Sequence, residues 1–178
     1  TLRFPDYDLI DAYVPSWLGE KTVVKPNGDN LFFNAEGDTI LIETQAGLND
    51  TWNLFKLDPS SYLEASVSDI STETILESQV DVKTISIQRK DYSNNALAHP
   101  LNGKTIKLSS SLGIIQGFDF HLFPEDTTQI EIAGKENPDV GIHRLTRNEV
   151  YDFQVGDEFH YESQERLGFS APIILRKQ

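Results

Sequence analysis

Histidine side chains are the groups in this chain that could most readily hold a metal ion. The four histidines are His99, His121, His143 and His160, and no two of them have the spacing of a zinc-binding helix. A zinc site would need at least three of them to converge from different strands. We therefore interpret each as a surface or structural histidine and expect no metal site.

Paired carboxylates could serve a glycosidase, which needs two of them about 5–10 Å apart. The chain holds 28 acidic residues, so composition alone singles out no pair. Candidates such as Asp119, Glu131, Asp157 and Glu158 are no better placed than the others. We expect no catalytic carboxylate, and keep a glycan-active enzyme only as the least favoured alternative.

Nucleophilic chemistry finds no support in the sequence either. Cysteine is absent, which excludes thiolate catalysis, disulfides and Cys-ligated metals. The run Ser109-Ser110-Ser111 lacks the Gly-x-Ser-x-Gly turn that exposes a serine nucleophile. The sequence therefore predicts a protein that is not an enzyme and that carries no cofactor.

Aromatic side chains could form a platform on which sugars stack. The two tryptophans are the obvious choices. Trp52 lies in a strand-like run, where burial is the default. Trp17 lies in an irregular stretch and is the candidate exposed contact, with an anchor to a partner domain as the alternative interpretation.

Charge and hydropathy limit the partners of this chain. Its formal net charge is −13, from 28 acidic and 15 basic residues, and no Lys/Arg cluster reverses the sign locally. Such a surface repels phosphate backbones, so we expect no nucleic-acid binding and no binding to anionic membranes. Apolar runs are only a few residues long, which predicts no membrane insertion.

The elements that would position any site are short strands. Residues 1–21 have neither helical nor strand periodicity and are expected to form an irregular N-terminal arm. From residue 22 the pattern alternates, and Asn27-Gly28 between two β-rich runs predicts a hairpin. Further strands are expected at 62–70, 72–80 and 82–88, separated by polar punctuation. The sequence predicts an all-β fold, either a sandwich or a curved antiparallel sheet, with one short helix after Thr146.

Alternation also predicts which side chains are inside. Trp52, Leu54 and Lys56 are expected on one face of their strand, and Asn53 and Phe55 on the other. In the same way, the aromatic-rich run at 118–122 is expected to place Phe118, Phe120 and Leu122 on one face. The expected core comprises Trp52, Phe118, Phe120 and Phe159, and Val82, Ile85 and Ile87 are the apolar positions of the strand expected at 82–88.

Three segments describe the expected domain organisation. The arm at 1–21 is followed by a β domain at 22–154, and residues 155–178 start a second β unit or supply the last strands of the same domain. Residues 155–161 repeat the apolar, acidic and aromatic pattern of 48–54; a real repeat predicts a second β unit from Val155, and a chance similarity leaves both alternatives open. The chain starts at Thr1 rather than Met, so we expect a processed protein or a fragment.

Four stretches resemble a known family. They are LNDTW (48–52), DVKTISIQ (81–88), IKLSSSLGIIQGFDF (106–120) and LTRNEVYDFQVGDEFHY (145–161). Together they resemble the β-rich N-terminal region of large secreted proteins of Bacteroidota, which the type IX secretion system exports and which typically end in a sorting domain. The resemblance implies an extracellular or cell-surface location, and no catalytic motif accompanies it. The lack of Cys and Met suits an oxidising exterior.

That resemblance shapes the expected function and partners. It implies a structural or adhesion-type module of a larger cargo protein, with other domains of the same polypeptide and type IX outer-membrane components as partners. The alternative is a carbohydrate-binding accessory domain. Bacteria of this group attach O-glycans at Asp-Thr/Ser followed by a small or apolar residue or Thr, which makes Thr39 and Thr127 candidate glycosylation sites, with ordinary turn residues as the alternative.

Overall fold

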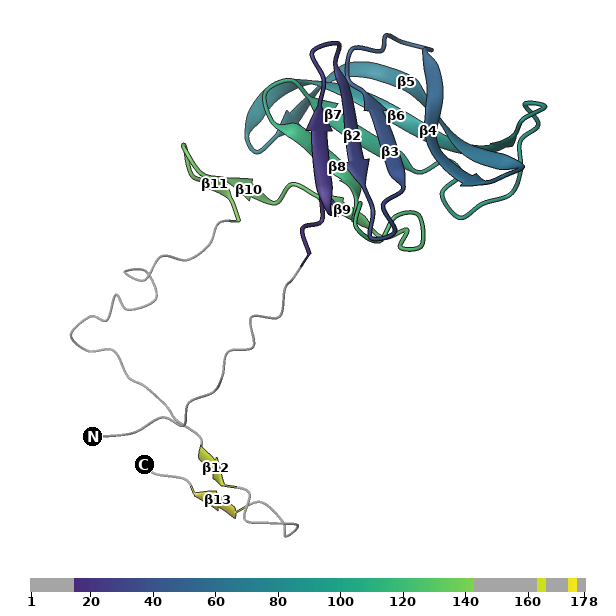
Figure 1. Cartoon of the computed structure of the whole chain (residues 1–178). Helices are drawn as coiled ribbons and strands as arrows, with labels where there is room; N and C mark the ends of the chain where they lie inside the picture. The colour runs from purple at the N-terminus through teal and green to yellow at the C-terminus, as the bar shows by residue number, and fades with distance from the viewer. Residues whose placement is uncertain (1–14, 143–162, 166–172, 176–178) are drawn as a thin grey trace. The chain divides into compact units, whose positions relative to one another are not determined.

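The computed structural model describes residues 15–142, 163–165 and 173–175, and within these ranges the chain is all-β. The predicted fold class is therefore confirmed, with a curled antiparallel sheet, shaped as a half-barrel, and smaller sheets (Figure 1). The short helix predicted after Thr146 lies outside the described residues.

Two units make up the chain, Thr1–His143 and Arg144–Gln178. In the second unit, β12 (Ser163–Glu165) pairs antiparallel with β13 (Ile173–Leu175). The boundary expected between residues 154 and 155 lies outside the described residues. In the first unit, the described part of the expected arm forms a turn before β1 begins at Lys21.

A three-stranded antiparallel sheet, the small sheet, opens the described region. It consists of β1 (Lys21–Val24), β2 (Asp29–Phe33) and β3 (Thr39–Glu43), in that order. The hairpin predicted at Asn27-Gly28 joins β1 to β2 and is confirmed, with Gly28 at a φ of 87°. The Asn27 amide side chain donates to Asp29 over 2.9 Å and holds this turn.

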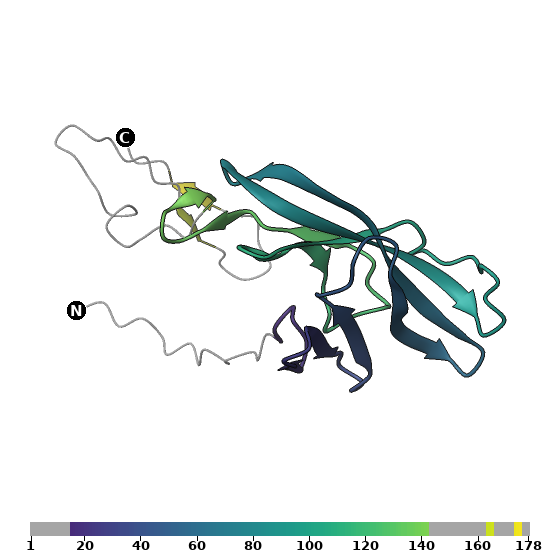
Figure 2. The ribbon, with the colours of Figure 1, turned by 90° about the horizontal axis from the view of Figure 1, so that it is seen from above.

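Six antiparallel strands in sequence order form the large sheet, which curls behind the small sheet (Figures 1 and 2). The strands are β4 (Thr51–Asp58), β5 (Ser61–Ile75), β6 (Ser78–Asp91), β7 (Thr105–Ser109), β8 (Gly113–Phe118) and β9 (Gln129–Glu131). A separate two-stranded ribbon follows, of β10 (Gly134–Lys135) and β11 (Val140–Gly141).

The long hairpin of β5 and β6 differs from the prediction. Residues 62–70 form a strand as predicted, but the boundary expected at Ser71 is wrong, because this strand continues as β5 to Ile75 and the chain reverses at Leu76-Glu77. Both turn residues have positive φ, 46° and 63°, as the tightest hairpin turns require. Neither is glycine or asparagine, so the usual sequence signal of such a turn is missing.

Burial confirms most of the expected core and corrects two positions. Trp52, Phe118 and Phe120 are buried as predicted, and Phe159 lies outside the described residues. The apolar positions Val82, Ile85 and Ile87 are buried as well. The prediction for Phe55 and Lys56 is wrong, because the register of β4 shifts at this point and buries Phe55 next to Leu54 while Lys56 is exposed.

Leu122 is the second correction. It was expected to lie on the same face as Phe118 and Phe120, but its side chain is exposed. Strand β8 ends at Phe118, and the Asp119 carboxylate then accepts the His121 backbone N–H over 2.9 Å. This turn breaks the alternation, and Phe123 takes the inward position instead, with 1% of its surface exposed.

The rings of Phe120 and Phe123 join the two sheets. The Phe120 ring lies 4.7 Å from that of Phe32 in the small sheet, and the Phe123 ring lies 5.4 Å from that of Phe55 in the large sheet. Buried Asn34 adds a polar clamp, because its amide donates to the Phe123 carbonyl over 2.9 Å and accepts the Asp38 N–H over 2.7 Å. The segment that follows β8 and carries Phe120 and Phe123 therefore holds the small sheet on the large sheet.

Removing one of these rings should destabilise the fold. We expect Phe123→Ala to lower the free energy of unfolding by about 3–5 kcal/mol, because a fully buried phenyl ring leaves a cavity. Urea unfolding followed by tryptophan fluorescence measures this. The matched control is Leu122→Ala, which should change the free energy by no more than about 0.5 kcal/mol because Leu122 is exposed. Equal losses in the two variants would contradict the inward position of Phe123.

Candidate functional site

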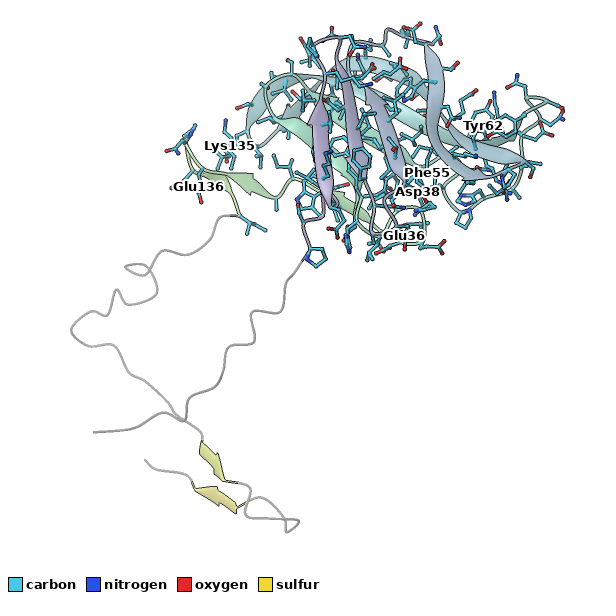
Figure 3. All side chains as sticks on the ribbon, in the orientation of Figure 1. Glu36, Asp38, Phe55, Tyr62, Lys135 and Glu136 are labelled. Carbon is cyan, nitrogen blue, oxygen red and sulfur yellow. The ribbon has the colours of Figure 1, made fainter. Side chains whose placement is uncertain are left out.

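A hollow on the outer face of β4, β5 and the segment after β6 is the candidate site, and we call it the tyrosine hollow. Its volume is about 440 Å³. It is lined by Thr51, Trp52, Asn53, Tyr62, Glu64, Tyr92 and Asn94. Figure 3 shows Tyr62 at the end of the large sheet where β4 and β5 join.

Two tyrosine rings form the apolar part of this hollow. The rings of Tyr62 and Tyr92 are 5.4 Å apart at an interplanar angle of 33°. Tyr62 is half-buried, whereas Tyr92 is 59% exposed. Trp52 closes the hollow from the core side, and its indole N–H is already used by the Leu41 carbonyl at 2.8 Å. The tyrosines are thus the aromatic surfaces open to a ligand.

Polar side chains surround the rings and are held in place by one another. Asn53 and Glu64 are direct cross-strand partners of β4 and β5. The Glu64 carboxylate pairs with Lys90 at 2.8 Å, and Lys90 also donates to the Asn94 side chain over 2.9 Å. The Glu64 carboxylate and the Asn94 amide are therefore held beside the tyrosine rings through Lys90.

Two aspartate-centred turns position the tyrosines. Before Tyr62, the Asp58 carboxylate accepts hydrogen bonds from Ser60 and from the Ser61 hydroxyl, the latter at 2.6 Å, and Arg89 approaches it at 3.2 Å. These hydrogen bonds hold the pKa of Asp58 below its usual range. Ser61 is completely buried although it is polar, so the turn is anchored to the sheet.

Around Tyr92, Asp91 plays the same part. Its carboxylate accepts the backbone N–H groups of Ser93 and Asn95 at 2.9 and 2.8 Å, and the Asn95 side chain at 2.9 Å. The hydrogen bonds from Asn95, followed by that from Ser93, lower the pKa of Asp91. Tyr92 is therefore presented from an ordered turn rather than from a loose loop.

The chemistry of this surface suits a ligand with both apolar faces and hydroxyl groups. Tyrosine rings offer flat apolar contact, while neighbouring amides and carboxylates donate and accept hydrogen bonds. Carbohydrates have this combination. In residues 15–142, no group of three or more His, Asp or Glu side chains could hold a metal ion.

One carboxylate with a raised pKa lies elsewhere. Partial burial, and then the nearby charges of Asp29 and Asp50, raise the pKa of Glu43. Glu43 is the cross-strand partner of Asp29 in the small sheet and does not line the tyrosine hollow. The tyrosine hollow itself contains one carboxylate, Glu64, which is paired with a lysine.

The residues singled out from the sequence lie outside the tyrosine hollow, in three different parts of the fold. Trp17 precedes β1, is 40% exposed and packs against Phe120 with ring centroids 6.3 Å apart. Thr39 is the exposed first residue of β3, and Thr127 is half-buried in the segment before β9. Within the described ranges, no hydrogen bond or aromatic contact brings these three together, and their roles as a contact and as glycosylation sites stay predictions.

Tyr62 and Tyr92 were missed by sequence reasoning. Tyr62 starts an alternating run in which Leu63, Ala65 and Val67 are buried, so the side chain of Tyr62 is expected on the outer face of the sheet. Tyr92 lies in a polar segment whose composition predicts an exposed loop. A signal was therefore present for each as an exposed aromatic, but nothing local indicates that the two rings meet.

Comparisons with protein-family models, with characterised proteins and with solved structures found no match to this chain. In the part of the chain that the structure describes, no helix is long and apolar enough to cross a membrane.

Acid should weaken the turn that positions Tyr62. A carboxylate whose pKa is lower in the folded than in the unfolded state stabilises the fold above its unfolded pKa of about 4, and this contribution is lost as pH falls. We therefore expect the free energy of unfolding to decrease from about pH 5 downward. Asp58→Asn removes the carboxylate and Ser61→Ala removes one of the hydrogen bonds that it accepts, so both variants should flatten this decrease.

Urea unfolding at a series of pH values measures the effect. Part of the slope should persist in both variants, because hydrogen bonds also lower the pKa of Asp91 and Asp126. A pH profile that is as steep in the two variants as in the unsubstituted protein would exclude Asp58 as a source of acid sensitivity.

Proposed function

We propose that this chain is a non-enzymatic, adhesion-type β module of a larger secreted protein and that it binds carbohydrate through the tyrosine hollow. The observation that carries the proposal is the pair of neighbouring tyrosine rings, half-buried Tyr62 and exposed Tyr92, beside amide and carboxylate groups. Of the alternatives drawn from the sequence, a carbohydrate-binding module is the one that calls for exposed aromatics on a sheet face.

The position of the rings on the fold supports recognition rather than packing. Tyr92 leaves 59% of its surface in water, so its ring is accessible to a ligand. Tyr62 comes from a strand and Tyr92 from an ordered turn, so little conformational entropy would be lost when a ligand binds. Such preorganisation is typical of binding sites.

The proposed location rests on other observations. A chain without cysteine or methionine is well suited to an oxidising exterior, and its net charge of −13 favours solubility over contact with nucleic acid. The resemblance to type IX cargo proteins supports export to the cell surface. We accordingly propose other domains of the same polypeptide, and the outer-membrane machinery that exports it, as protein partners.

A glycan array probed with the whole chain tests the binding proposal. We expect one class of glycan to bind, and Tyr62→Ala and Tyr92→Ala each to weaken that binding about tenfold, because each removes a stacking surface. Tyr62→Phe and Tyr92→Phe are the matched controls, since they keep the rings and should retain most of the affinity.

Lys56→Ala serves as a surface control. Lys56 is exposed and pairs with Tyr62 across β4 and β5, but it does not line the tyrosine hollow, so the variant should bind normally. Urea midpoints confirm that each variant is folded. Absence of any glycan ligand, or binding that survives loss of both rings, would refute carbohydrate recognition and leave a purely structural module.

A further inference from the structure

The space between the two sheets is not filled along its whole length. Its open end forms a cavity of about 400 Å³, which we call the end cavity. This volume falls in the range of about 300–1,000 Å³ that is usual for small-molecule sites. The cavity lies between β2 and β3 of the small sheet and β5 to β8 of the large sheet, and is separate from the tyrosine hollow.

One row of side chains across four strands forms a wall of this cavity. Ile70 of β5 pairs with Lys83 of β6, Lys83 pairs with Leu108 of β7, and Leu108 pairs with Ile114 of β8. All four line the cavity. Because directly paired residues share a sheet face, the row presents three branched apolar side chains and a single cation to the same space.

The small sheet supplies the facing wall. Phe32 and Ile42 are buried there and continue the core, whereas Asn30 occupies the next inward position along β2. The Asn30 side-chain oxygen is buried, and among the described residues it accepts no hydrogen bond. A buried acceptor without a donor costs about 1–3 kcal/mol, so this atom points to a ligand that donates a hydrogen bond.

Lys83 restricts the charge of that ligand. Its ammonium donates to the backbone carbonyls of Thr44, over 2.7 Å, and Ala46, and so closes the small sheet over the large one. Burial lowers the pKa of Lys83, and the charge of Asp50 partly offsets this. Asp81 also lines the cavity, but it is exposed to water, and its carboxylate accepts a hydrogen bond from the Thr72 hydroxyl over 3.0 Å.

These constraints select one kind of head group. A carboxylate only accepts hydrogen bonds and would leave the Asn30 oxygen unsatisfied, and the Lys83 ammonium that would attract it already donates to the Thr44 and Ala46 carbonyls. An ammonium ion would be repelled by half-buried Lys83. An uncharged hydroxyl donates to Asn30 without either penalty.

We propose that the end cavity binds a small apolar alcohol, whose hydrocarbon body packs on Ile70, Leu108 and Ile114 and whose hydroxyl donates to the Asn30 side-chain oxygen. This site does not depend on the carbohydrate-binding proposal, because the two share no residue. Burial of the hydrocarbon body supplies the affinity, and the hydrogen bond supplies the preference for an alcohol.

Titration of the whole isotope-labelled chain with 1-octanol, octanoate and octylamine, followed by amide NMR, tests the proposal. We expect 1-octanol to shift the resonances of Ile70, Leu108 and Ile114, and to bind about tenfold more tightly than either charged analogue. Equal affinity for the three probes, or no shift at the solubility limit of 1-octanol, would overturn it.

Two substitutions and a matched control complete the experiment. Asn30→Leu should weaken 1-octanol binding about tenfold while raising the urea midpoint, because it removes the unsatisfied oxygen. Leu108→Trp should abolish binding by filling the cavity. Asn53→Leu, in the tyrosine hollow, should leave 1-octanol binding unchanged. Undiminished binding to a folded Asn30→Leu variant would overturn the role of Asn30 even if Leu108→Trp does not fold.

Discussion

The rings of Phe120 and Phe123 hold the small sheet against the large sheet, and the other features of the domain follow from this packing. Phe120 reaches Phe32, Phe123 reaches Phe55, and both are almost fully buried. The segment that carries them follows β8 but is not part of any strand, so the two rings are free to enter the space between the sheets. Asn34 fixes the backbone of this segment from the small sheet, and the apolar contact is thereby given a defined geometry.

Because these rings fill one part of the space between the sheets, the two ends of the domain differ. Where they pack, the core is continuous and apolar. Further along β2 and β6, Asn30 and Lys83 occupy the inward positions. Their polar side chains do not fill the space between the sheets as apolar side chains would. The sheets are instead bridged there by Lys83, which bonds the backbone beyond β3. Polar side chains at inward-facing strand positions therefore leave a cavity at this end.

The outer face of the large sheet follows a different rule. Here the side chains are held by cross-strand pairs and by aspartate-centred turns. Asp58 and Asp91 stand at turns beside Tyr62 and Tyr92, and their hydrogen bonds fix the two rings close to each other. The curled sheet thus separates a surface available for recognition from the core that stabilises it.

The sequence by itself determined the β class, the hairpin at Asn27-Gly28 and the burial of Trp52, Phe118 and Phe120, because alternation and turn chemistry are properties of neighbouring residues. Only the tertiary structure decided the register shift that buries Phe55, the turn at Leu76-Glu77 and the inward position of Phe123. The meeting of Tyr62 with Tyr92, and the row that sets Lys83 beside Ile70 and Leu108, likewise depend on pairing between distant strands. Register is a long-range property, and no local pattern specifies which side chains it brings together.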